Sequence, residues 1–355
     1  MDNKALVVGV TGITGSTLAK KLIDQGWETY GLARNPEKAN IKGLHTIAAD
    51  LLDYENLAKA LADIKPTHVY IATWMRKDTE AENIEVNGKM VKNLLKALSP
   101  NKSVQHVALV TGLKHYLGPF DSYAKGELPE TPFREEQPRL DVPNFYYAQE
   151  DEVYAAAKRD GFTWSIHRPH TVIGKAVGNM MNMGTTLAVY ASICKETGKP
   201  FIWPGSKAQW EGISDMTDAK VLSDHLIWAS TNEKTKNEDF NITNGDVFRW
   251  SWMWDKIADY FNVEAQGYDG TEHPLEKQME NDENLWKEIS KKYKLEETNL
   301  NRLASPWHTD LDLGRPMEIM TDMSKSRKLG FSVYEETKDS FYKLFDELRK
   351  EHLIP

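Results

Sequence analysis

The sequence predicts a doubly wound α/β fold, in which helices cover both faces of a parallel β-sheet. Three observations support this prediction. Short runs of β-branched and other apolar residues alternate with segments whose apolar residues recur at helical spacing. A glycine-rich turn separates the first apolar run from the first helical segment. The alternation continues to about residue 167, and strands that alternate with helices form parallel sheets buried on both faces.

The first half of the chain supplies the strands and helices of this sheet. Residues 4–9 form a compact apolar run, and residues 13–24 follow with apolar side chains at helical spacing. Gly161 predicts the end of the last helix, because glycine commonly ends helices in a left-handed conformation. The predicted strands span residues 4–9, 28–33, 45–49, 68–72, 106–111 and 163–167, and the predicted helices span residues 13–24, 53–62, 82–98 and about 145–159.

The second half of the chain has a less regular pattern. Nine of the 11 tryptophans lie at or after Trp164, and we expect most of these rings to be core residues. The pattern predicts a smaller, mostly helical domain that closes over the sheet. The expected sheet domain comprises residues 1–170, completed by part of 212–250, and the expected substrate-binding domain comprises residues 171–211 and 251–355.

The composition restricts the class of protein. The 355 residues include 44 Lys and Arg and 53 Asp and Glu, with a formal net charge of −9, and 40% are hydrophobic. These values are typical of a globular protein, and the acidic balance argues against general nucleic-acid binding.

The uncharged segment 176–194 is polar enough to predict a loop and a helix beside a pocket, not a membrane span. The single cysteine, Cys194, excludes an intrachain disulfide, and with no signal-peptide pattern we expect a cytoplasmic location.

The glycine-rich turn predicts a dinucleotide site. It reads Gly9-Val10-Thr11-Gly12-Ile13-Thr14-Gly15 and lies between the first strand and the first helix. In a Rossmann fold the first glycine permits the tight turn, the second lets the backbone approach phosphate, and the third lets the helix pack against the strand. The pyrophosphate would then rest on the N-terminus of the helix.

The residues after the second strand indicate which dinucleotide is bound. An acidic residue there would bind the ribose 2′-hydroxyl of NAD, whereas this chain has Arg34, which suits a 2′-phosphate. NADP is therefore the expected cofactor, and a solvated arginine in a turn is the alternative. Asp50 follows the third strand, where the adenine ring would lie, and Ala72 and Thr73 end the fourth strand beside the cofactor.

The usual Tyr-x-x-x-Lys pair of short-chain dehydrogenases occurs only at an unfavourable place. Tyr154 and Lys158 have the right spacing, but Tyr154 lies eight residues beyond Tyr146, roughly 12 Å further along the helix from the active edge of the sheet. Tyr146 and Tyr147 lie at the start of that helix, yet the residue four positions after Tyr146 is Glu150. A cation from another segment would therefore have to replace the lysine.

Lys114 is the candidate for that cation. It follows the fifth predicted strand, and the carboxyl ends of parallel strands meet at one edge of the sheet. A lysine in a loop is as readily explained as a solvated side chain, so the sequence alone leaves both interpretations open. His167 and His170 lie near each other but lack a third ligand at metal-site spacing, so we expect no metal and a structural histidine pair.

Two segments resemble signature motifs of a known family. Residues 111–120 and 144–151 are similar to motifs of the progesterone 5β-reductase/iridoid synthase-like family, which are atypical extended short-chain dehydrogenases/reductases. The similarity continues through residues 167–169, 180–182, 214–219, 225–229 and 240–248 and covers nearly the whole chain.

The resemblance implies NADPH-dependent 1,4-reduction of the C=C bond of enones and enals, including steroid-like and monoterpenoid-like substrates. It identifies Tyr146 as the catalytic tyrosine and Lys114 as its partner, and it suggests a small hydrophobic enone as substrate and a homodimer. The expected substrate pocket contains Trp74, Met180, Met181 and Phe331. The expected cofactor-binding residues are Gly9, Thr11, Gly12, Ile13, Thr14, Gly15, Arg34, Asp50, Leu51, Ala72, Thr73, Thr111, Lys114, Tyr146, Pro169 and Val172.

Two other functions fit the same fold. A carbonyl reductase or sugar-nucleotide epimerase would use Tyr154 and Lys158. A non-catalytic NADP-sensing regulator would bind the dinucleotide without turnover, although such a sensor has no use for Tyr146 and Lys114. Product analysis distinguishes the first alternative from enone reduction, and cofactor binding without turnover distinguishes the second.

Overall fold

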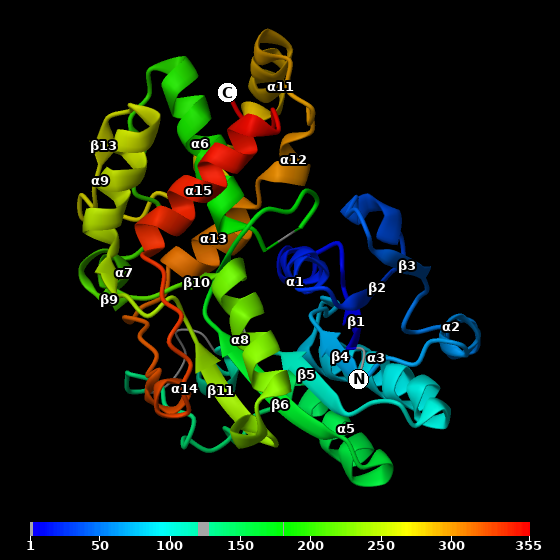
Figure 1. The fold of residues 1–355 in the computed structure, drawn as a ribbon. Helices are drawn as coiled ribbons and strands as arrows, with labels where there is room; N and C mark the ends of the chain where they lie inside the picture. The colour runs from blue at the N-terminus through cyan, green and yellow to red at the C-terminus, as the bar shows by residue number, and fades with distance from the viewer. Residues whose placement is uncertain (1–2, 120–127, 180) are drawn as a thin grey trace.

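A seven-stranded parallel sheet forms the centre of the computed structural model, which describes residues 3–119, 128–179 and 181–355 (Figure 1). The strand order is β11-β6-β5-β4-β1-β2-β3, so the chain winds outward from β1 in one direction and then returns to wind outward in the other. This order confirms the predicted doubly wound class. The strands are β1 (Lys4–Val8), β2 (Glu28–Ala33), β3 (His45–Ala48), β4 (His68–Ile71), β5 (His106–Val110), β6 (Thr163–Pro169) and β11 (Glu238–Ile242).

Helices cover both faces of the sheet. Successive side chains of a strand point to opposite faces, so Leu6 and Val8 of β1 pack on one side while Ala5 and Val7 pack on the other. All four are completely buried, which explains why β1 reads as a continuous apolar run. The first side is covered by α2 (Tyr54–Leu61), α3 (Glu80–Leu98) and α5 (Phe145–Asp160), and the second by α1 (Ile13–Asp24) and α8 (Ala219–Thr231).

The helix and strand boundaries differ little from the predicted ones. The largest differences are at α3, which begins two residues earlier than predicted, and at β6, which extends two residues further, to Pro169. The earlier start of α3 has a local cause. Thr79 accepts a hydrogen bond from the backbone of Glu82, whose carboxylate in turn accepts one from the backbone of Thr79. This reciprocal capping box fixes the helix start before residue 82.

The second half of the chain forms a mostly helical layer with its own core, grouped above the sheet in Figure 1. Trp203, Trp250, Trp254 and Trp286 are fully buried there, as expected for core aromatics, whereas Trp252 is 42% exposed. The helices of this layer are α6 (Met183–Thr197), α7 (Lys207–Glu211), α9 (Trp250–Phe261), α10 (Leu275–Gln278), α11 (Asp282–Tyr293), α12 (Leu300–Leu303), α13 (Pro306–Leu313) and α15 (Thr337–Lys350). The short helix α14 (Ser324–Lys328) lies beside β11 instead (Figure 1). Three two-stranded ribbons join these elements: β7 (Val172–Ile173) with β10 (Thr217–Asp218), β9 (Ile213–Ser214) with β12 (Phe248–Arg249), and β8 (Phe201–Ile202) with β13 (Ala265–Gln266).

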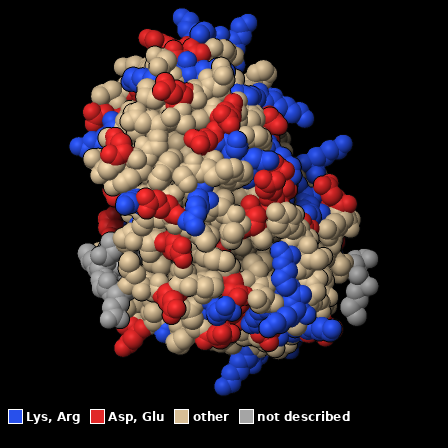
Figure 2. Space-filling view, turned by 90° about the vertical axis from the view of Figure 1, so that its left-hand side faces the viewer, with Lys and Arg blue, Asp and Glu red and all other residues tan. Residues whose placement is uncertain are grey.

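The surface and the helix lengths agree with the composition. On the face drawn in Figure 2, acidic and basic side chains are interspersed, and no broad area carries one sign of charge. Within the described residues, no helix is both long enough and apolar enough to cross a membrane.

A row of hydrogen-bonded, buried polar side chains runs from β5 through β6 and α8 to α14. Ser165 Oγ lies 2.9 Å from His106 Nε2 and 2.8 Å from His167 Nε2. His167 Nδ1 is 2.9 Å from His225 Nδ1, and His225 Nε2 is 2.9 Å from Ser326 Oγ. The sequence suggested that His167 pairs with His170. In the structure His167 pairs instead with His225 on α8. His170 instead donates from Nδ1 to the backbone and side-chain oxygens of Asp215.

One end of this row sets the direction of its first hydrogen bond. Thr163 Oγ1 donates to the carbonyl of Gln105, which can only accept, so His106 Nδ1 donates to Thr163. A neutral His106 then accepts at Nε2 from Ser165, and the same alternation of one donor and one acceptor nitrogen continues through His167 and His225. The network therefore fits three neutral imidazoles. Burial lowers the pKa of His106 and His225 to about 3 and holds the pKa of His167 well below its ordinary value.

These histidines predict a loss of stability in mild acid. Because their pKa values are lower in the folded state, the unfolded chain binds more protons below pH 6.5, and folding becomes less favourable as pH falls. Between pH 6.5 and 5.5 we expect His106 and His225 each to reduce the free energy of unfolding by about 1 kcal/mol, and His167 to act in the same direction. Urea unfolding at pH 7.5, 6.5 and 5.5 measures the effect. His225→Gln should flatten the pH dependence, while the exposed His45→Gln should not, and equal slopes for the two variants would contradict the assignment.

Candidate active site

The glycine turn after β1 has the shape of a phosphate cradle. Gly9 has a φ of +88°, and a Cβ there would lie 2.7 Å from the carbonyl oxygen of Ala72 at the end of β4. A Cβ on Gly15 would lie 2.2 Å from the carbonyl oxygen of Gly9, so helix and turn touch without side chains. At Gly12 the nearest atom would be 3.4 Å away, and no side chain caps α1 there. Backbone can therefore approach an anion at Gly12, and the start of α1 fits a pyrophosphate.

The other expected cofactor residues lie along the same edge. Arg34 follows β2 and is exposed, and Asp50 follows β3 and accepts a hydrogen bond from the backbone of Leu52. The Leu51 side chain is in the core, so only its backbone is available to a ligand. Thr73 lies beside Gly9. Around the start of α1, Thr11 is exposed, Thr14 is partly exposed, and Val172 packs on the cluster that contains Ile13.

The hydroxyl of Tyr146 lies between the carboxyl ends of β5 and β6. A Cβ placed on Gly112, two residues after β5, would be 3.3 Å from the Tyr146 oxygen and 3.4 Å from the carbonyl oxygen of Pro169. Thr111, which precedes this glycine, is buried and donates from its backbone to His167. Tyr146 itself is 8% exposed and lies in the first turn of α5, directly after Phe145. The phenol is thus at the edge of the sheet where the glycine turn lies.

Lys114 is brought to the same place by α4 (Lys114–Leu117). Its side chain is 4% exposed, which rules out the interpretation that it is a solvated loop lysine. The ammonium nitrogen lies 4.6 Å from the ring centre of Phe145, whose ring is 4.5 Å from that of Tyr146. Trp74 stacks on Phe145 with the ring centres 5.0 Å apart. Lys114, Tyr146 and Trp74 therefore converge around one aromatic ring.

Asn144 connects the two segments directly. Its side-chain oxygen accepts a hydrogen bond from the backbone of Tyr146 at 3.0 Å and so caps the N-terminus of α5. Its side-chain nitrogen donates to the carbonyl oxygen of Lys114 at 2.8 Å. One buried amide thus fixes the start of α5 against α4, a role that the motif in residues 144–151 did not indicate.

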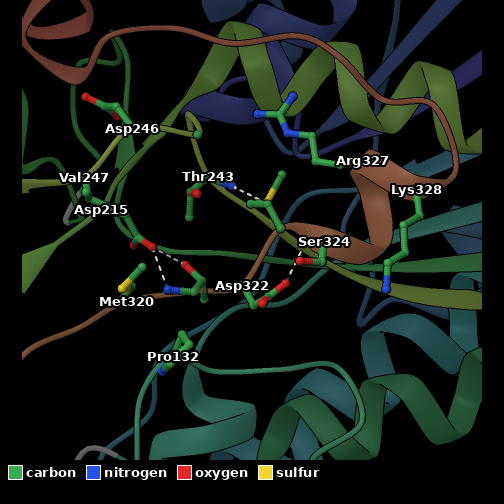
Figure 3. Close-up of a pocket in the computed structure, with 13 residues that line it drawn as sticks. Pro132, Asp215, Thr243, Asp246, Val247, Met320, Asp322, Ser324, Arg327 and Lys328 are labelled. Carbon is green, nitrogen blue, oxygen red and sulfur yellow. Dashed lines mark hydrogen bonds between the residues drawn. The ribbon is translucent and has the colours of Figure 1, made fainter.

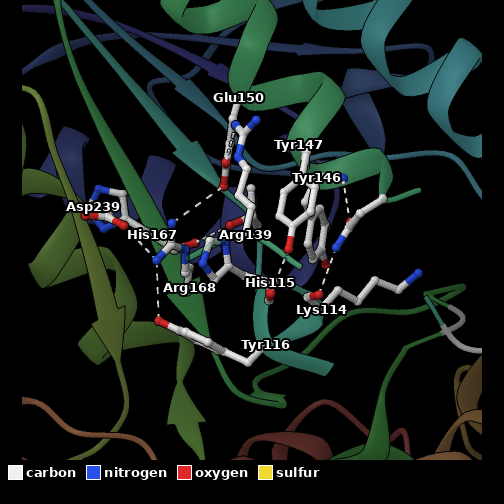
Figure 4. A network of polar contacts seen from close by, with 12 residues as sticks. Lys114, His115, Tyr116, Arg139, Tyr146, Tyr147, Glu150, His167, Arg168 and Asp239 are labelled. Carbon is white, nitrogen blue, oxygen red and sulfur yellow. Dashed lines mark hydrogen bonds and ion pairs between the residues drawn. The ribbon is translucent and has the colours of Figure 1, made fainter. Parts of the chain in front are cut away.

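The neighbouring tyrosine, Tyr147, is a structural residue. Its hydroxyl donates to the carbonyl oxygen of His115 at 2.8 Å and accepts from the backbone of Leu140 at 3.0 Å. Figure 4 shows its ring beside that of Tyr146, with its hydroxyl directed toward His115. Burial raises the pKa of Tyr147. Its hydroxyl is engaged with two backbone groups, so we assign it a structural role.

Glu150, the residue four positions after Tyr146, belongs to a network of buried ion pairs. Glu150 is 1% exposed and accepts a hydrogen bond from Arg139 at 2.7 Å, with Arg168 3.9 Å away (Figure 4). Arg168 in turn pairs with Asp239 of β11 at 2.6 Å. Burial raises the pKa of Glu150 above its ordinary value, and the two arginines oppose that rise. This position therefore ties α5 to β6 and β11.

The alternative pair, Tyr154 and Lys158, does not form a site. The Tyr154 ring packs on Trp164 with the centres 4.6 Å apart, and burial raises the pKa of its hydroxyl. Lys158 is exposed near the C-terminal end of α5. Both lie far along the helix from Tyr146, as the sequence predicted.

The expected substrate pocket is only partly assembled. Trp74 is partly exposed beside Phe145, and Met181 follows a loop whose Asn179 lies next to Gly12. Met180 lies outside the described residues. Phe331 is not brought to this group. It is 2% exposed and packs on His225 and Trp228 of α8, so it is a core residue of the α8 side and not a wall of the pocket.

The C-terminal layer reaches the site through α13. The guanidinium of Arg76, two residues after Trp74, lies 4.0 Å from the ring centre of Trp307. This cation–π contact joins the loop between β4 and α3 to the layer that packs above the sheet.

A separate cavity lies near the carboxyl end of β11 (Figure 3). It has a volume of about 410 Å³ and contains neither Tyr146 nor Lys114. Two of its carboxylates are engaged by neighbours: Asp215 accepts from Thr321, and Asp322 accepts from Ser324. Within the described part of the chain, no group of three or more His, Cys, Asp or Glu residues could hold a metal ion.

The fold is that of an extended short-chain dehydrogenase/reductase. Residues 38–355 match the PRISE-like Rossmann-fold domain, and the chain belongs to that family. The family predicted from residues 111–120 and 144–151 is thereby confirmed.

Curated relatives match the chain over its full length. An (S)-8-oxocitronellyl enol synthase from Nepeta cataria is 39% identical, with 100% of this chain and 94% of the relative aligned. A 3-oxo-Δ(4,5)-steroid 5-beta-reductase from Arabidopsis thaliana is 38% identical with the same coverage. An (S)-8-oxocitronellyl enol synthase from Catharanthus roseus is 39% identical over 99% of this chain and 92% of its own length.

Solved structures share the fold at low identity. The UDP-glucose 4-epimerase of Thermus thermophilus, in complex with NAD, is 16% identical with a TM-score of 0.69 over 98% of this chain and 99% of its own. The Bordetella bronchiseptica enzyme WbmG, in complex with NAD and UDP, is 17% identical with a TM-score of 0.67 over 99% and 96%. These similarities establish the architecture.

The free energy of unfolding can distinguish the role of the Tyr147 hydroxyl from that of the Tyr154 hydroxyl. Tyr147→Phe removes a hydroxyl that satisfies two backbone groups, so we expect the free energy of unfolding to fall by about 1–3 kcal/mol. Tyr154→Phe keeps the ring on Trp164 and should cost less than about 0.5 kcal/mol. Urea unfolding at pH 7.5 measures both. Equal losses would mean that the Tyr147 hydroxyl does not hold His115 and Leu140.

Proposed function

We propose that this protein is an NADPH-dependent enone reductase, which adds hydride to the β-carbon of an activated C=C bond while Tyr146 and Lys114 stabilise the resulting enolate. The observation that carries the proposal is the buried Lys114 ammonium beside Phe145, with the Tyr146 hydroxyl at the carboxyl ends of β5 and β6. Support also comes from relatives at 38–39% identity that are named as enol synthases and as a steroid 5-beta-reductase.

The residues along the edge fit an NADP molecule. The backbone at Gly12 and the start of α1 would hold the pyrophosphate, Arg34 the 2′-phosphate, and Asp50 and the Leu51 backbone the adenine. Ala72, Thr73, Thr111, Pro169 and Val172 would border the nicotinamide half. When bound, NADPH supplies the hydride.

The chain's own groups act on the carbonyl oxygen of the substrate. As the β-carbon accepts hydride, negative charge develops on that oxygen, because the enone becomes an enolate. The Tyr146 hydroxyl donates a hydrogen bond to it, and the Lys114 ammonium adds a favourable positive charge from a site with little water. Preorganised donors of this kind contribute roughly 100- to 1,000-fold in rate. Protonation of the α-carbon from solvent then completes the reduction.

An apolar pocket would hold the substrate skeleton. Trp74 and Met181, with Met180 outside the described residues, supply the apolar and polarisable surface that such a ligand needs. We assign the closing of this pocket to residues 171–211 and 251–355, whose separate core supports their treatment as a substrate-binding domain. The substrate is then a small hydrophobic enone. A cytoplasmic location and a homodimer complete the proposal, the first supported by the single buried Cys194 and the second by family resemblance alone.

The reaction can be tested with a simple substrate. Purified protein, NADPH and 2-cyclohexen-1-one should give cyclohexanone, identified by gas chromatography. Allylic alcohol as the sole product would reject 1,4-reduction and favour a carbonyl reductase. Cofactor binding without turnover across enones, aldehydes and ketones would favour a sensor. Tyr146→Phe should lower kcat by roughly 100- to 1,000-fold, whereas Tyr154→Phe should change it less than about twofold.

The cofactor assignment has its own test. Arg34→Ala removes the cation expected to pair with the 2′-phosphate, so the Kd for NADPH should rise by roughly 10- to 100-fold. The Kd for NADH should stay within about twofold, since NADH lacks that phosphate. Quenching of protein fluorescence measures both constants. Lys20→Ala, which removes an exposed charge on α1, is the control, and a similar effect of both variants on NADPH would contradict the role of Arg34.

A further inference from the structure

Glu80 occupies an unexpected position between the two segments of the site. It is the first residue of α3, where an acidic residue is ordinarily explained by the positive end of the helix dipole. The capping of α3 is, however, carried out by Thr79 and Glu82. The Glu80 carboxylate instead reaches toward another helix, and its side chain is only 14% exposed.

The Glu80 carboxylate contacts both sides of the candidate site. Oε1 accepts a hydrogen bond from the backbone of Phe145, the first residue of α5, at 2.8 Å. Oε2 lies 3.8 Å from the Lys114 ammonium nitrogen and accepts from the side chain of Asn83 at 3.3 Å. Phe145 is the residue before Tyr146, and its ring lies under the same ammonium. Glu80 is therefore bound at once to the lysine and to the turn that carries the tyrosine.

We propose that Glu80 is a positioning residue for the reaction: its carboxylate keeps the buried Lys114 charged and fixes that charge beside the first turn of α5. The inference rests on the proposed function, because it assigns to Glu80 an effect on the step in which Tyr146 and Lys114 act.

The direction of the effect follows from two opposing contributions. A negative carboxylate opposes the build-up of enolate charge, which by itself would slow the reaction. A buried ammonium that loses a nearby carboxylate, however, holds its proton less strongly or moves toward water. Lys114 is 4% exposed, so the second contribution is the larger one. Removing the charge of Glu80 should therefore slow the reaction.

Glu80→Gln isolates the charge, because glutamine retains an oxygen that accepts from the Phe145 backbone. We expect kcat for 2-cyclohexen-1-one to fall by about tenfold or more, while KM for the enone and the Kd for NADPH change by less than about twofold. Glu82→Gln on the same helix is the matched control, since glutamine also serves in a capping box. Glu80→Asp, which keeps the charge, should recover most of the lost rate.

A double-mutant cycle separates an effect through Lys114 from a merely structural one. In a Lys114→Met background, Glu80→Gln should cause no further loss of kcat, because the ammonium on which it acts is gone. Equal kcat for Glu80→Gln and Glu82→Gln, a faster Glu80→Gln enzyme, or full multiplicative loss in the double variant would each overturn the inference. If the unmodified protein fails to reduce the enone, the proposed function fails first. If it is active but Glu80→Gln matches the control, only the role of Glu80 fails.

Discussion

The side-chain amide of Asn144 is the contact on which the candidate site depends. The tyrosine and the lysine lie 32 positions apart in the sequence, on α5 and α4, and neither helix alone fixes their relative position. The two hydrogen bonds of Asn144, to the Lys114 carbonyl and from the Tyr146 backbone, remove that freedom. Tyr147 adds a second connection through the His115 carbonyl. Because these bonds involve backbone groups, they hold the segments together without using the Tyr146 hydroxyl or the Lys114 ammonium.

The fourth position after Tyr146 has a structural role in this chain. In the usual arrangement a cation there serves the tyrosine from the same helix. Here the position is occupied by Glu150, which is buried between Arg139 and Arg168 and links α5 to the outer strands β6 and β11. An acidic side chain this close to Tyr146 would oppose an enolate if it were unpaired. Its pairing with Arg139 limits that cost, and the charge next to Phe145 then comes from Lys114.

The sequence predicted the sheet and its edge well because both follow from local patterns. The alternation of apolar runs with helical segments determines β1 to β6, and the rule that parallel strands end at one edge brings the glycine turn, Lys114 and Tyr146 together. Residues that act across long distances in the sequence were not predictable in this way. The role of Glu80 depends on an amide 65 positions away, and an acidic residue at a helix start has a sufficient local explanation. Phe331 was expected in the pocket from the family resemblance, whereas its ring packs with α8, because a resemblance gives no information about which face of the sheet a side chain covers.

The groups around the candidate site fit the proposed stabilisation of an enolate. His115 is the histidine next to Lys114 in the chain, and burial lowers its pKa to about 4, so it is neutral at pH 7. Its Nε2 donates to the Gln137 carbonyl, and Tyr147 is bound to the backbone. Ketone reduction needs a group that delivers a proton to the oxygen that receives charge, whereas 1,4-reduction needs only a hydrogen-bond donor and a fixed positive charge at that oxygen. A phenol and a buried ammonium held by backbone contacts meet the second requirement, because preorganised groups need little rearrangement when the charge develops.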